Sequence, residues 1–441
     1  MKKLGLLLLL LNSISLLAAN NIISSGFFIQ DIDKTFLKQI KNKKGLIIDH
    51  VSSKGFELYG DNKLESWLVK NSPVLFYKID NNIHKSALQN YPNPEQIERT
   101  LKTLAKQNPS IFKLFSIGKT QEGRELWVMK VSDNVEVDET EPEFKYVANM
   151  HGDEIVGREM MVSLLEDLAK GYSESHQNIV ELINNTEIFI MPSLNPDGAS
   201  KRRRGNSNWR DLNRDFPDVD SDADGIRPRQ RQLETLAMMN FQESRNFSLS
   251  ANFHGGTEVV NYPWDTKRAD FPLLELVKDL SLEYAQAIPS MRDNDEFTDG
   301  IVNGYAWYEI NGGMQDWSYH WHNDLQVTIE LSHSKWPSYS QVPGYYQKNK
   351  SSLLTFMKRI HQGLGLKFNK KIDGNIVIRK LIGNNYQEII SMKLTKNEFY
   401  KVLEPGNYQL DIQSNGVSKT IYKEVLADKI FINGEFETVE F

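Results

Sequence analysis

A short histidine–glutamate pair and one distant histidine place the strongest constraint on this chain. His151 and Glu154 stand three residues apart in the run His-Gly-Asp-Glu, and His254 lies far downstream. A catalytic zinc ion takes three protein ligands and keeps one position open for water, whereas a structural zinc is closed by four ligands. A close pair plus one remote ligand is the layout of the catalytic kind. The fold must therefore bring two distant segments together at one point.

The composition is that of a soluble globular protein with more than one domain. The 441 residues suggest roughly two to four domains, and 40% hydrophobic and 25% charged residues are ordinary values. A formal net charge of −6 gives no argument for nucleic-acid binding, and it neither favours nor excludes a cationic substrate. The chain has no cysteine, which excludes disulfides, thiol catalysis and a lipoprotein cysteine.

Residues 1–19 are predicted to be a signal peptide. Lys2 and Lys3 precede an apolar run over 4–11, and small residues end the segment at Ala18-Ala19. The run is short for a membrane span, and a retained membrane anchor is the alternative interpretation. We expect an exported protein, periplasmic or secreted, with no stable membrane insertion after cleavage. An exported chain without cysteine is more typical of bacteria than of the eukaryotic secretory pathway.

Residues 24–82 are expected to form a small α+β domain. Residue patterns indicate helices and strands in the order βαββαβ, at 27–29, 36–40, 46–48, 56–59, 64–69 and 74–77. This order is that of a ferredoxin-like, split-βαβ unit. Pro92-Asn93-Pro94 marks the start of the next unit. The sequence leaves open whether residues 20–90 restrain activity as a pro-segment or only pack against the following domain.

Residues 91–365 alternate helical periodicity with short β-rich runs. This alternation predicts an α/β domain with a mixed, largely parallel sheet flanked by helices. Functional groups of such sheets gather beyond the carboxyl ends of the strands. His151, Asn195 and His254 each follow an expected strand, at 146–148, 188–191 and 249–253.

Residues 366–441 differ from the rest of the chain, because alternation at period two with regular turns dominates. Strands are expected at 376–378, 389–390, 408–412 and 421–422. The pattern predicts a small antiparallel β-sandwich. The segment contains no histidine, so we assign it no metal chemistry.

Six motifs occur in a fixed order along the chain. They are His151-Gly-Asp-Glu154, Asn195-Pro-Asp-Gly198, Asp211-Leu-Asn-Arg-Asp-Phe-Pro217, His254-Gly-Gly256, Gly312-Gly-Met-Gln-Asp-Trp317 and Thr328-Ile-Glu-Leu-Ser332. Together they resemble the zinc metallocarboxypeptidases of the regulatory type, the group that contains carboxypeptidases N, E, M and D. The resemblance covers 91–441, since that group carries a transthyretin-like β-domain after the catalytic domain. Residues 20–90 resemble a small domain that precedes the peptidase in some bacterial relatives.

The resemblance implies one zinc ion per catalytic site, bound by His151, Glu154 and His254. Mixed nitrogen and carboxylate ligation keeps zinc Lewis-acidic enough to activate water and polarise a carbonyl. Asp211 is a candidate for the acceptor that orients a ligand imidazole, with an ordinary turn carboxylate as the alternative. The remaining histidines are interpreted as surface or core residues (His50, His84, His176, His361) or as residues that no family motif claims as ligands (His320, His322, His333).

Glu330 is predicted to be the general base and acid. It interrupts the apolar run Val327-Thr-Ile-Glu-Leu331, where an unpaired carboxylate would be costly to bury. A position beside a cation removes that cost. There the carboxylate would take a proton from the activated water and return it to the leaving amine. The alternative is an edge-strand glutamate that faces solvent.

Three basic or amide residues match family positions that contact the reacting end of the substrate. Arg204 matches the arginine that stabilises the oxyanion, although Arg203 in the same run of charges is an alternative. Asn213 and Arg214 match the pair that holds the terminal carboxylate, which a planar guanidinium meets through two bonds. The family usually has Asn after this Arg, whereas Asp215 stands here and would weaken carboxylate binding unless it faces away.

The resemblance also implies residues that close over the substrate and read its last side chain. Tyr308 matches the mobile tyrosine of the family, with a buried aromatic as the alternative. Asp265 matches the acid that pairs with a C-terminal Lys or Arg, and Gln315 matches a polar position in the same pocket. A helix cap or turn acid is the alternative for Asp265. A desolvated Asp without a cation is unfavourable, so such a pocket discriminates for basic side chains.

We therefore expect a zinc-dependent exopeptidase that removes single C-terminal residues, preferably Lys or Arg, from peptides or proteins. One alternative is a related peptidase acting on cell-wall peptides, whose acidic or amidated ends do not need Asp265. The other is a catalytically silent binder of basic peptide tails. The presence of Glu330 argues against this last class.

Overall fold

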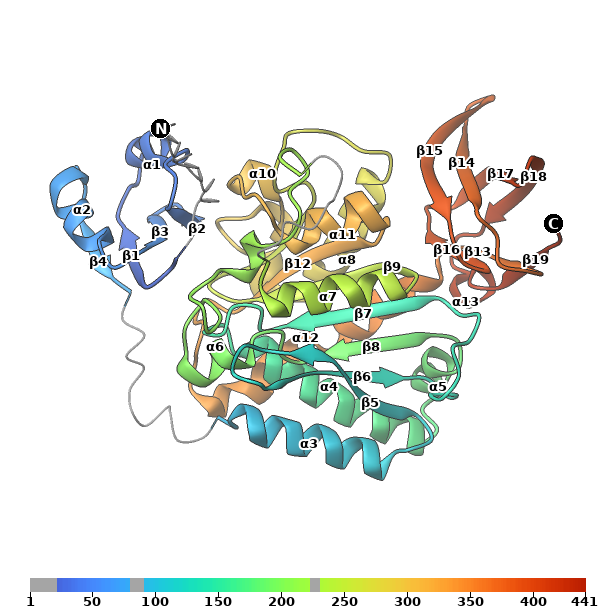
Figure 1. Cartoon of the computed structure of the whole chain (residues 1–441), viewed down its shortest axis with the longest axis horizontal. Coiled ribbons are helices and arrows are strands. Elements are labelled where there is room, and N and C mark those ends of the chain that lie inside the picture. Colours follow the sequence, from blue (N-terminus) through green and yellow to red (C-terminus); the bar gives the residue numbers. More distant parts are fainter. Residues whose placement is uncertain (1–21, 80–90, 223–230) are drawn as a thin grey trace, which may run out of the picture.

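The computed structural model of the chain describes residues 22–79, 91–222 and 231–441. The signal peptide expected at 1–19 lies outside the described residues, as does His84. Figure 1 shows a small N-terminal unit, a central α/β unit and a C-terminal β unit. Within the described ranges, no helix has the length and apolar character needed to cross a membrane.

The N-terminal unit, residues 22–79, is a four-stranded sheet covered by two helices. Its elements are β1 (Ser25–Ile29), α1 (Thr35–Ile40), β2 (Ile47–Ser52), β3 (Gly55–Gly60), α2 (Leu64–Asn71) and β4 (Phe76–Lys78). The strand order is β2-β3-β1-β4, with every neighbouring pair antiparallel. Alternate residues of β1 and β3 bury Phe27, Ile29, Phe56 and Leu58 against both helices. The predicted βαββαβ order is confirmed.

The central unit is built on an eight-stranded mixed sheet with the order β11-β10-β12-β9-β7-β8-β6-β5. The strands are β5 (Phe112–Lys119), β6 (Glu125–Val131), β7 (Glu143–Ala148), β8 (Glu187–Met191), β9 (Phe247–His254), β10 (Glu258–Tyr262), β11 (Ile301–Asn303) and β12 (Leu325–Leu331). The four central strands, β12, β9, β7 and β8, run parallel. The prediction of a mixed, largely parallel sheet is confirmed.

Helices cover both faces of this sheet (Figure 1). They are α3 (Pro94–Gln107), α4 (Val156–Ser173), α5 (Gln177–Ile183), α6 (Pro196–Lys201), α7 (Leu233–Ser244), α8 (Leu274–Gln286), α9 (Pro289–Arg292), α10 (Gly304–Trp307), α11 (Met314–His322) and α12 (Val342–Lys358). The side chains of β7 alternate between two cores. Phe144 and Tyr146 pack in the core with α4, α8 and α12, and Val147 packs in the core with α7 and α11. Burial on both faces explains why the central strands are nearly continuous apolar runs.

The central unit begins with a helix cap at Asn93, within the Pro92-Asn93-Pro94 run that marks the start of this unit in the sequence. Asn93 Oδ1 accepts a hydrogen bond from the Gln96 backbone N–H at 2.8 Å, and the Gln96 side chain bonds back to Asn93. Pro94 occupies the first turn, where its missing N–H costs nothing. These residues fix the beginning of α3.

The C-terminal unit contains two small sheets, β16-β13-β19 and β15-β14-β17-β18. Its elements are β13 (Gly363–Phe368), β14 (Gly374–Ile382), β15 (Asn385–Leu394), β16 (Glu398–Val402), β17 (Gly406–Ser414), β18 (Val417–Val425), α13 (Ile430–Asn433) and β19 (Phe436–Val439). The antiparallel expectation is wrong for one pair, because β13 and β19 are parallel. The chain passes through α13 between β18 and β19 and so enters the other sheet in the parallel sense. The buried residues of this unit join the core beneath α4 and α12.

Candidate active site

Three neighbouring parallel strands deliver the candidate catalytic residues to one edge of the central sheet. β7 ends at Ala148, just before His151, and β9 ends at His254. β12 places Glu330 beside His254 in the strand register. The turn that carries His151 and Glu154 then leads into α4. The carboxyl edge of the sheet therefore gathers residues that are far apart in the sequence.

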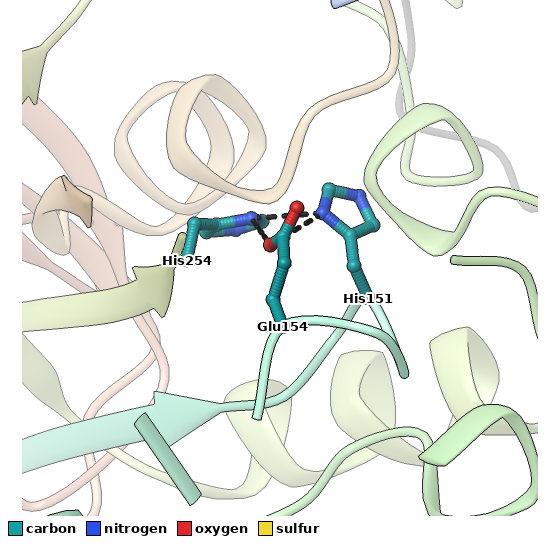
Figure 2. A group of neighbouring side chains, drawn as sticks. All are labelled: His151, Glu154 and His254. Atoms are coloured by element: carbon teal, nitrogen blue, oxygen red, sulfur yellow. Dashed lines mark hydrogen bonds and ion pairs between the residues drawn. The ribbon is translucent and has the colours of Figure 1, made fainter. Parts of the chain in front are cut away.

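The ligand atoms of His151, Glu154 and His254 face one another (Figure 2). Oε2 of Glu154 lies 2.9 Å from Nδ1 of His151 and 2.9 Å from Nδ1 of His254, and the two nitrogens are 3.0 Å apart. All three side chains are buried. Two imidazole nitrogens and one carboxylate oxygen are the donor set of an open, catalytic zinc site. Their convergence within one ligand sphere fits a zinc ion held by these three residues.

Asp211 contacts one member of this cluster, His151, and the adjacent Arg204. Its Oδ1 is 3.0 Å from Nε2 of His151, and its Oδ2 accepts a hydrogen bond from Nε of Arg204 at 2.9 Å. Burial alone would raise the pKa of Asp211, but Arg204 and then His151 hold that pKa well below its ordinary value. A permanently ionised carboxylate on the outer nitrogen orients the His151 ring toward the ligand cluster.

Glu330 points into the same space from the middle of a buried strand. Its side chain is 5% exposed. No hydrogen-bond partner of its Oε2 is found among the described residues. A buried carboxylate oxygen without a donor is costly unless a cation, water or substrate completes it. The position is therefore suited to a proton-transfer group.

Arg204, rather than Arg203, reaches the cluster. Arg204 lies 3.4 Å from Oε1 of Glu154 through Nη1, in addition to its bond to Asp211. Arg203 instead stacks on the ring of Trp209, with its guanidinium carbon 4.2 Å from the ring centre. Arg204 is buried, and its Nη2 has no partner among the described residues. That group remains available to an anionic oxygen.

Asn213 and Arg214 lie on the turn that follows Asp211. Asn213 Oδ1 accepts a hydrogen bond from the Met314 backbone N–H at 3.0 Å, and Nη1 of Arg214 donates to the Asn213 carbonyl at 2.9 Å. Asp215 faces away from this pair, since its Oδ2 accepts from the Gln232 backbone N–H at 2.8 Å. Its negative charge is directed toward the start of α7.

Asp265 is buried in a group of polar side chains that includes Asn261 and Gln315. Oδ1 of Asp265 accepts hydrogen bonds from the amides of Asn261 and Gln315, each at 3.1 Å. The carbonyl oxygens of these two amides have no partner among the described residues. Oδ1 of Asp316 accepts a hydrogen bond from the Asp265 backbone N–H at 2.9 Å. Burial and then the charge of Asp316 raise the pKa of Asp265 well above its ordinary value.

The comparisons with known proteins agree with this geometry. A family model described as zinc carboxypeptidase matches residues 97–352, which is more than half of the chain. The chain belongs to the zinc carboxypeptidase family. It is 38% identical to human carboxypeptidase D over 348 residues, covering 73% of this chain and 25% of that protein. It is 36% identical to mouse carboxypeptidase M over 368 residues, covering 77% of this chain and 81% of that protein.

The chain thus spans a quarter of the length of carboxypeptidase D. Among solved structures, carboxypeptidase A from Helicoverpa armigera superposes with a TM-score of 0.60 at 18% identity, covering 76% of this chain and 97% of that chain. At that identity the likeness shows the fold alone. The α/β fold expected from the sequence is that of the zinc carboxypeptidases.

Two residues at the candidate site were missed by sequence reasoning. Asp49 and His50 come from β2 of the N-terminal unit, and both lie beside Glu154 with ligand atoms no more than 4.8 Å apart. The sequence interpretation gave His50 only a structural role. Nothing in the local sequence marks the pair, because its place in the site depends on how two units pack.

The structure also shows the surroundings of Tyr308 and of several remaining histidines. Tyr308 lies at the end of α10, and its hydroxyl donates to Oδ1 of Asp49 at 2.8 Å. His320 and His322 pack against tryptophan rings, and His361 lies 2.6 Å from the Thr186 hydroxyl. Among the described residues, no group with metal-ligand spacing contains His320, His322 or His333.

Proposed function

We propose that this chain hydrolyses the last peptide bond of peptides or proteins and prefers C-terminal Lys or Arg. The relatives named above are carboxypeptidases, which supports the exopeptidase reaction. The observation that carries the basic preference is the buried polar group formed by Asp265, Asn261 and Gln315. Three buried side chains there offer oxygen atoms, and two of the three lack a donor among the described residues.

A guanidinium or ammonium group would supply the hydrogen-bond donors that these buried oxygen atoms need. Asp265 is 2% exposed, so its charge has little access to water. A cationic side chain would offset the cost of ionising Asp265 and would donate to the free oxygens of Asn261 and Gln315. An apolar or acidic side chain would leave these acceptors unpaired, which costs about 1–3 kcal/mol for each buried group. The pocket therefore favours basic residues by exclusion as well as by attraction.

The proposed reaction assigns one task to each side chain around the cluster. His151, Glu154 and His254 would hold zinc, which supplies a Lewis acid that activates water and polarises the scissile carbonyl. Glu330 takes a proton from the attacking water and delivers it to the leaving amine. Arg204 faces the developing oxyanion through its free Nη2. A donor of this kind contributes about 10²–10³-fold in rate.

Substrate binding is assigned to the residues beyond Arg204. Asn213 and Arg214 would hold the terminal carboxylate, which restricts cleavage to the last residue. Tyr308 would close over the bound residue, and Gln315 would line its side-chain pocket with Asp265. Substrates would be peptide or protein C-termini, met outside the cytoplasm if residues 1–19 act as an export signal.

A peptide panel tests this proposal. The zinc-loaded chain is incubated with peptides that differ only in the last residue, Arg, Lys, Phe or Glu, and the products are identified by mass spectrometry. We expect single-residue release from the Arg and Lys peptides, and none after treatment with a chelator. Faster release from Glu or amidated ends would favour the cell-wall alternative. Binding of Arg-ended peptides without release would favour the silent binder.

A matched variant tests the pocket. Asp265→Asn keeps the shape of the side chain and one acceptor oxygen but removes its charge. We expect kcat/KM for Arg-ended peptides to fall by about 30-fold or more, the scale for one buried charged partner, while that for Phe-ended peptides changes little. Equal losses on both peptides would contradict the assignment of Asp265 to side-chain recognition.

A further inference from the structure

The N-terminal unit, residues 22–79, has an excess of positive charge that the rest of the chain lacks. It contains nine lysines, no arginine and six acidic residues, which gives a net charge of +3. The whole chain has a net charge of −6, so the residues outside this unit together carry −9. A charge asymmetry of this kind is typical of a chain in which one part meets an anionic partner.

The lysines of this unit do not form ion pairs with neighbouring carboxylates. Lys34 is half-buried, and its Nζ donates to backbone carbonyls, among them that of Asp31 at 3.1 Å. Within the described residues, the ion pairs of the unit involve only Asp49, His50 and Glu57 on its side. The other eight lysines are exposed and uncompensated: Lys38, Lys41, Lys43, Lys44, Lys54, Lys63, Lys70 and Lys78.

Most of these lysines lie on the face of the unit that is formed by α1, α2 and the segments beside them. We call residues 32–44 and 61–75 the helical face. Its exposed lysines are Lys38, Lys41, Lys43, Lys44, Lys63 and Lys70, and its exposed acidic residues are Asp33, Asp61 and Glu65. Positive charge therefore dominates the helical face.

Aromatic contacts show that the two helices and the lysine run at 41–44 belong to one surface. The rings of Phe36 in α1 and Trp67 in α2 stack with their centres 6.2 Å apart, so the helices lie side by side. Nζ of Lys43 lies 5.0 Å from the centre of the Trp67 ring. The run that follows α1 is thus held against α2.

The helical face also exposes large apolar side chains. Val69, Ile32 and Leu75 are 72%, 69% and 66% exposed, the three highest values for large apolar side chains in the described part of the chain. Single exposed apolar residues are ordinary at a protein surface. Three of them on one small unit, beside uncompensated lysines, indicate an interaction site.

These apolar side chains come from segments that meet at one end of the helical face. The Leu75 carbonyl accepts a hydrogen bond from the Gln30 backbone N–H at 2.9 Å, so the segment that leaves β1 toward Ile32 starts beside the segment that enters β4. Val69 belongs to the last turn of α2, which leads into that second segment. Lys70 follows Val69 and adds a positive charge at the same end.

The helical face is directed away from the central unit. β2 and β3 provide contacts on the opposite side: Trp307 Nε1 donates to the Val51 carbonyl at 2.6 Å, and Lys335 Nζ donates to Oε2 of Glu57 at 2.7 Å. Figure 1 shows α2 on the side of the N-terminal unit that is farthest from the central unit. The helical face is therefore accessible to a partner.

An anionic lipid surface matches both parts of the helical face. Its headgroups attract lysines, and its acyl region accepts exposed apolar side chains. A soluble polyanion would pair with the lysines but would offer Ile32, Val69 and Leu75 no apolar contact. Because the rest of the chain carries −9, a negative surface would repel it and would orient the N-terminal unit toward the lipid.

We propose that the helical face of residues 22–79 binds the chain to an anionic lipid surface. The lysines supply the long-range attraction, and Ile32, Val69 and Leu75 enter the interface between headgroups and acyl chains. The chain then lies on the surface without spanning it. This inference goes beyond the proposed function and does not depend on it, because no residue of the candidate catalytic cluster takes part.

Vesicle binding provides the first test. The chain is used from residue 20, the form expected after removal of the predicted signal peptide, so that the apolar run over 4–11 cannot bind lipid. Sedimentation compares vesicles of phosphatidylcholine alone with vesicles of phosphatidylcholine and phosphatidylglycerol in equal amounts. We expect binding to the anionic vesicles to be about tenfold stronger or more, and to weaken as salt is added. Equal binding to both kinds of vesicle would overturn the proposal.

Neutralising the lysine run tests the electrostatic part. Lys41→Gln, Lys43→Gln and Lys44→Gln are combined in one variant. A lysine near an anionic surface contributes about fivefold to binding, so we expect the partition coefficient for anionic vesicles to fall roughly 100-fold.

The matched control removes the same charge elsewhere. It combines Lys367→Gln, Lys370→Gln and Lys371→Gln, three exposed lysines of the C-terminal unit. This control should bind anionic vesicles within about twofold of the unchanged chain, because its lysines do not meet the lipid. If the two triple variants bind alike, the helical face is not the binding surface.

Replacing apolar side chains distinguishes a lipid surface from a soluble polyanion. Val69→Ser and Leu75→Ser, combined in one variant, should weaken binding to anionic vesicles about tenfold or more, because both side chains lose an apolar environment. Binding of dextran sulfate, which offers charge but no apolar phase, should not change. Vesicle binding that is unaffected by this variant would assign the helical face to polyanions and overturn the lipid proposal.

Two further measurements separate lipid binding from folding and from catalysis. All substituted side chains are exposed and lie outside the candidate active site, so thermal unfolding and arginine release from a soluble Arg-ended peptide should match those of the unchanged chain. Loss of vesicle binding with unchanged unfolding supports the lipid proposal. Absence of arginine release from every protein, with vesicle binding as expected, would reject the proposed function alone.

Discussion

Glu330 and His254 occupy the same register position on the neighbouring parallel strands β12 and β9. Adjacent strands of a sheet lie about 4.8 Å apart, so this register fixes the spacing of the two side chains through backbone hydrogen bonds. The proton-transfer group and a metal ligand are thus positioned by the sheet itself. His151 reaches the same point from the next strand, β7, through a short turn.

The first prediction concerns Glu330→Gln. The substitution preserves shape but removes the carboxylate that accepts a proton, so we expect kcat to fall by about 10²–10⁴-fold. Zinc content and the Kd for free arginine, the product released from an Arg-ended peptide, should stay near those of the parent chain, since neither depends on proton transfer. The kcat, the zinc content and the Kd are measured side by side for the unchanged chain and for Glu330→Gln. A Glu330→Gln variant that keeps a tenth of the parent activity would exclude Glu330 as the base.

The second prediction concerns the acceptor behind His151. Asp211→Asn replaces an ionised carboxylate on Nε2 of His151 by a neutral amide. We expect zinc affinity to fall by about 10–100-fold, the usual effect of removing such a partner. Competition with a fluorescent zinc chelator measures the Kd. Asp220→Asn, an exposed carboxylate of the same segment, should leave the Kd unchanged.

Much of the fold was predictable because local patterns and tertiary structure agree. The βαββαβ order of residues 22–79 and the strands that lead to His151 and His254 follow from apolar runs separated by turn residues. The pairing of β13 with β19 was not predictable. It depends on which sheet the last strand enters, and β13, β16 and β19 are short strands without strong alternation.

The candidate site was predicted from the ordered motifs and from further positions that the family resemblance implies. Arg204 and Arg203 are adjacent in one basic run, and only the structure separates the one beside Glu154 from the one stacked on Trp209. Asp49 and His50 were missed for a different reason. Their role depends on docking between two units, and docking leaves no periodicity in a single sequence.

The third prediction concerns the pH dependence of the pocket at Asp265. Its pKa is raised by burial and by Asp316, so the free protein binds a proton there at pH values where the unfolded chain has released it. The free energy of unfolding therefore falls as pH rises from the ordinary Asp value, 3.8, through the raised one. Asp265→Asn should be more stable at neutral pH by about 1–3 kcal/mol, and equal at low pH.

The binding of a basic substrate should depend on the same titration of Asp265, but with the opposite dependence on pH. A C-terminal Arg needs the ionised form of Asp265, so KM for Arg-ended peptides should rise as the pH is lowered through the raised pKa. KM for Phe-ended peptides should lack this change, because no charge is needed in the pocket. Steady-state kinetics of both peptides across pH measure the difference. Identical profiles for the two peptides would place the titrating group outside the side-chain pocket.

The last prediction concerns a buried lysine between the central and C-terminal units. Lys401 on β16 donates to the backbone carbonyl of Asn323 at 3.0 Å, and no carboxylate lies within ion-pair distance of it in the described ranges. Burial lowers its pKa from 10.5 to about 8. Between these values the unfolded chain holds a proton that the folded protein releases, so the free energy of unfolding rises with pH.

Lys401→Met removes this titration while filling a similar volume. At neutral pH it removes a burial cost of roughly 3 kcal/mol, and it also leaves the Asn323 carbonyl without its donor, which offsets part of that gain. The loss of this hydrogen bond does not vary with pH, so it does not affect how the difference in unfolding free energy changes with pH. Urea unfolding between pH 7 and 10 should show the unchanged chain gaining stability relative to Lys401→Met. Parallel curves for the two proteins would mean that Lys401 keeps an ordinary pKa in the folded state.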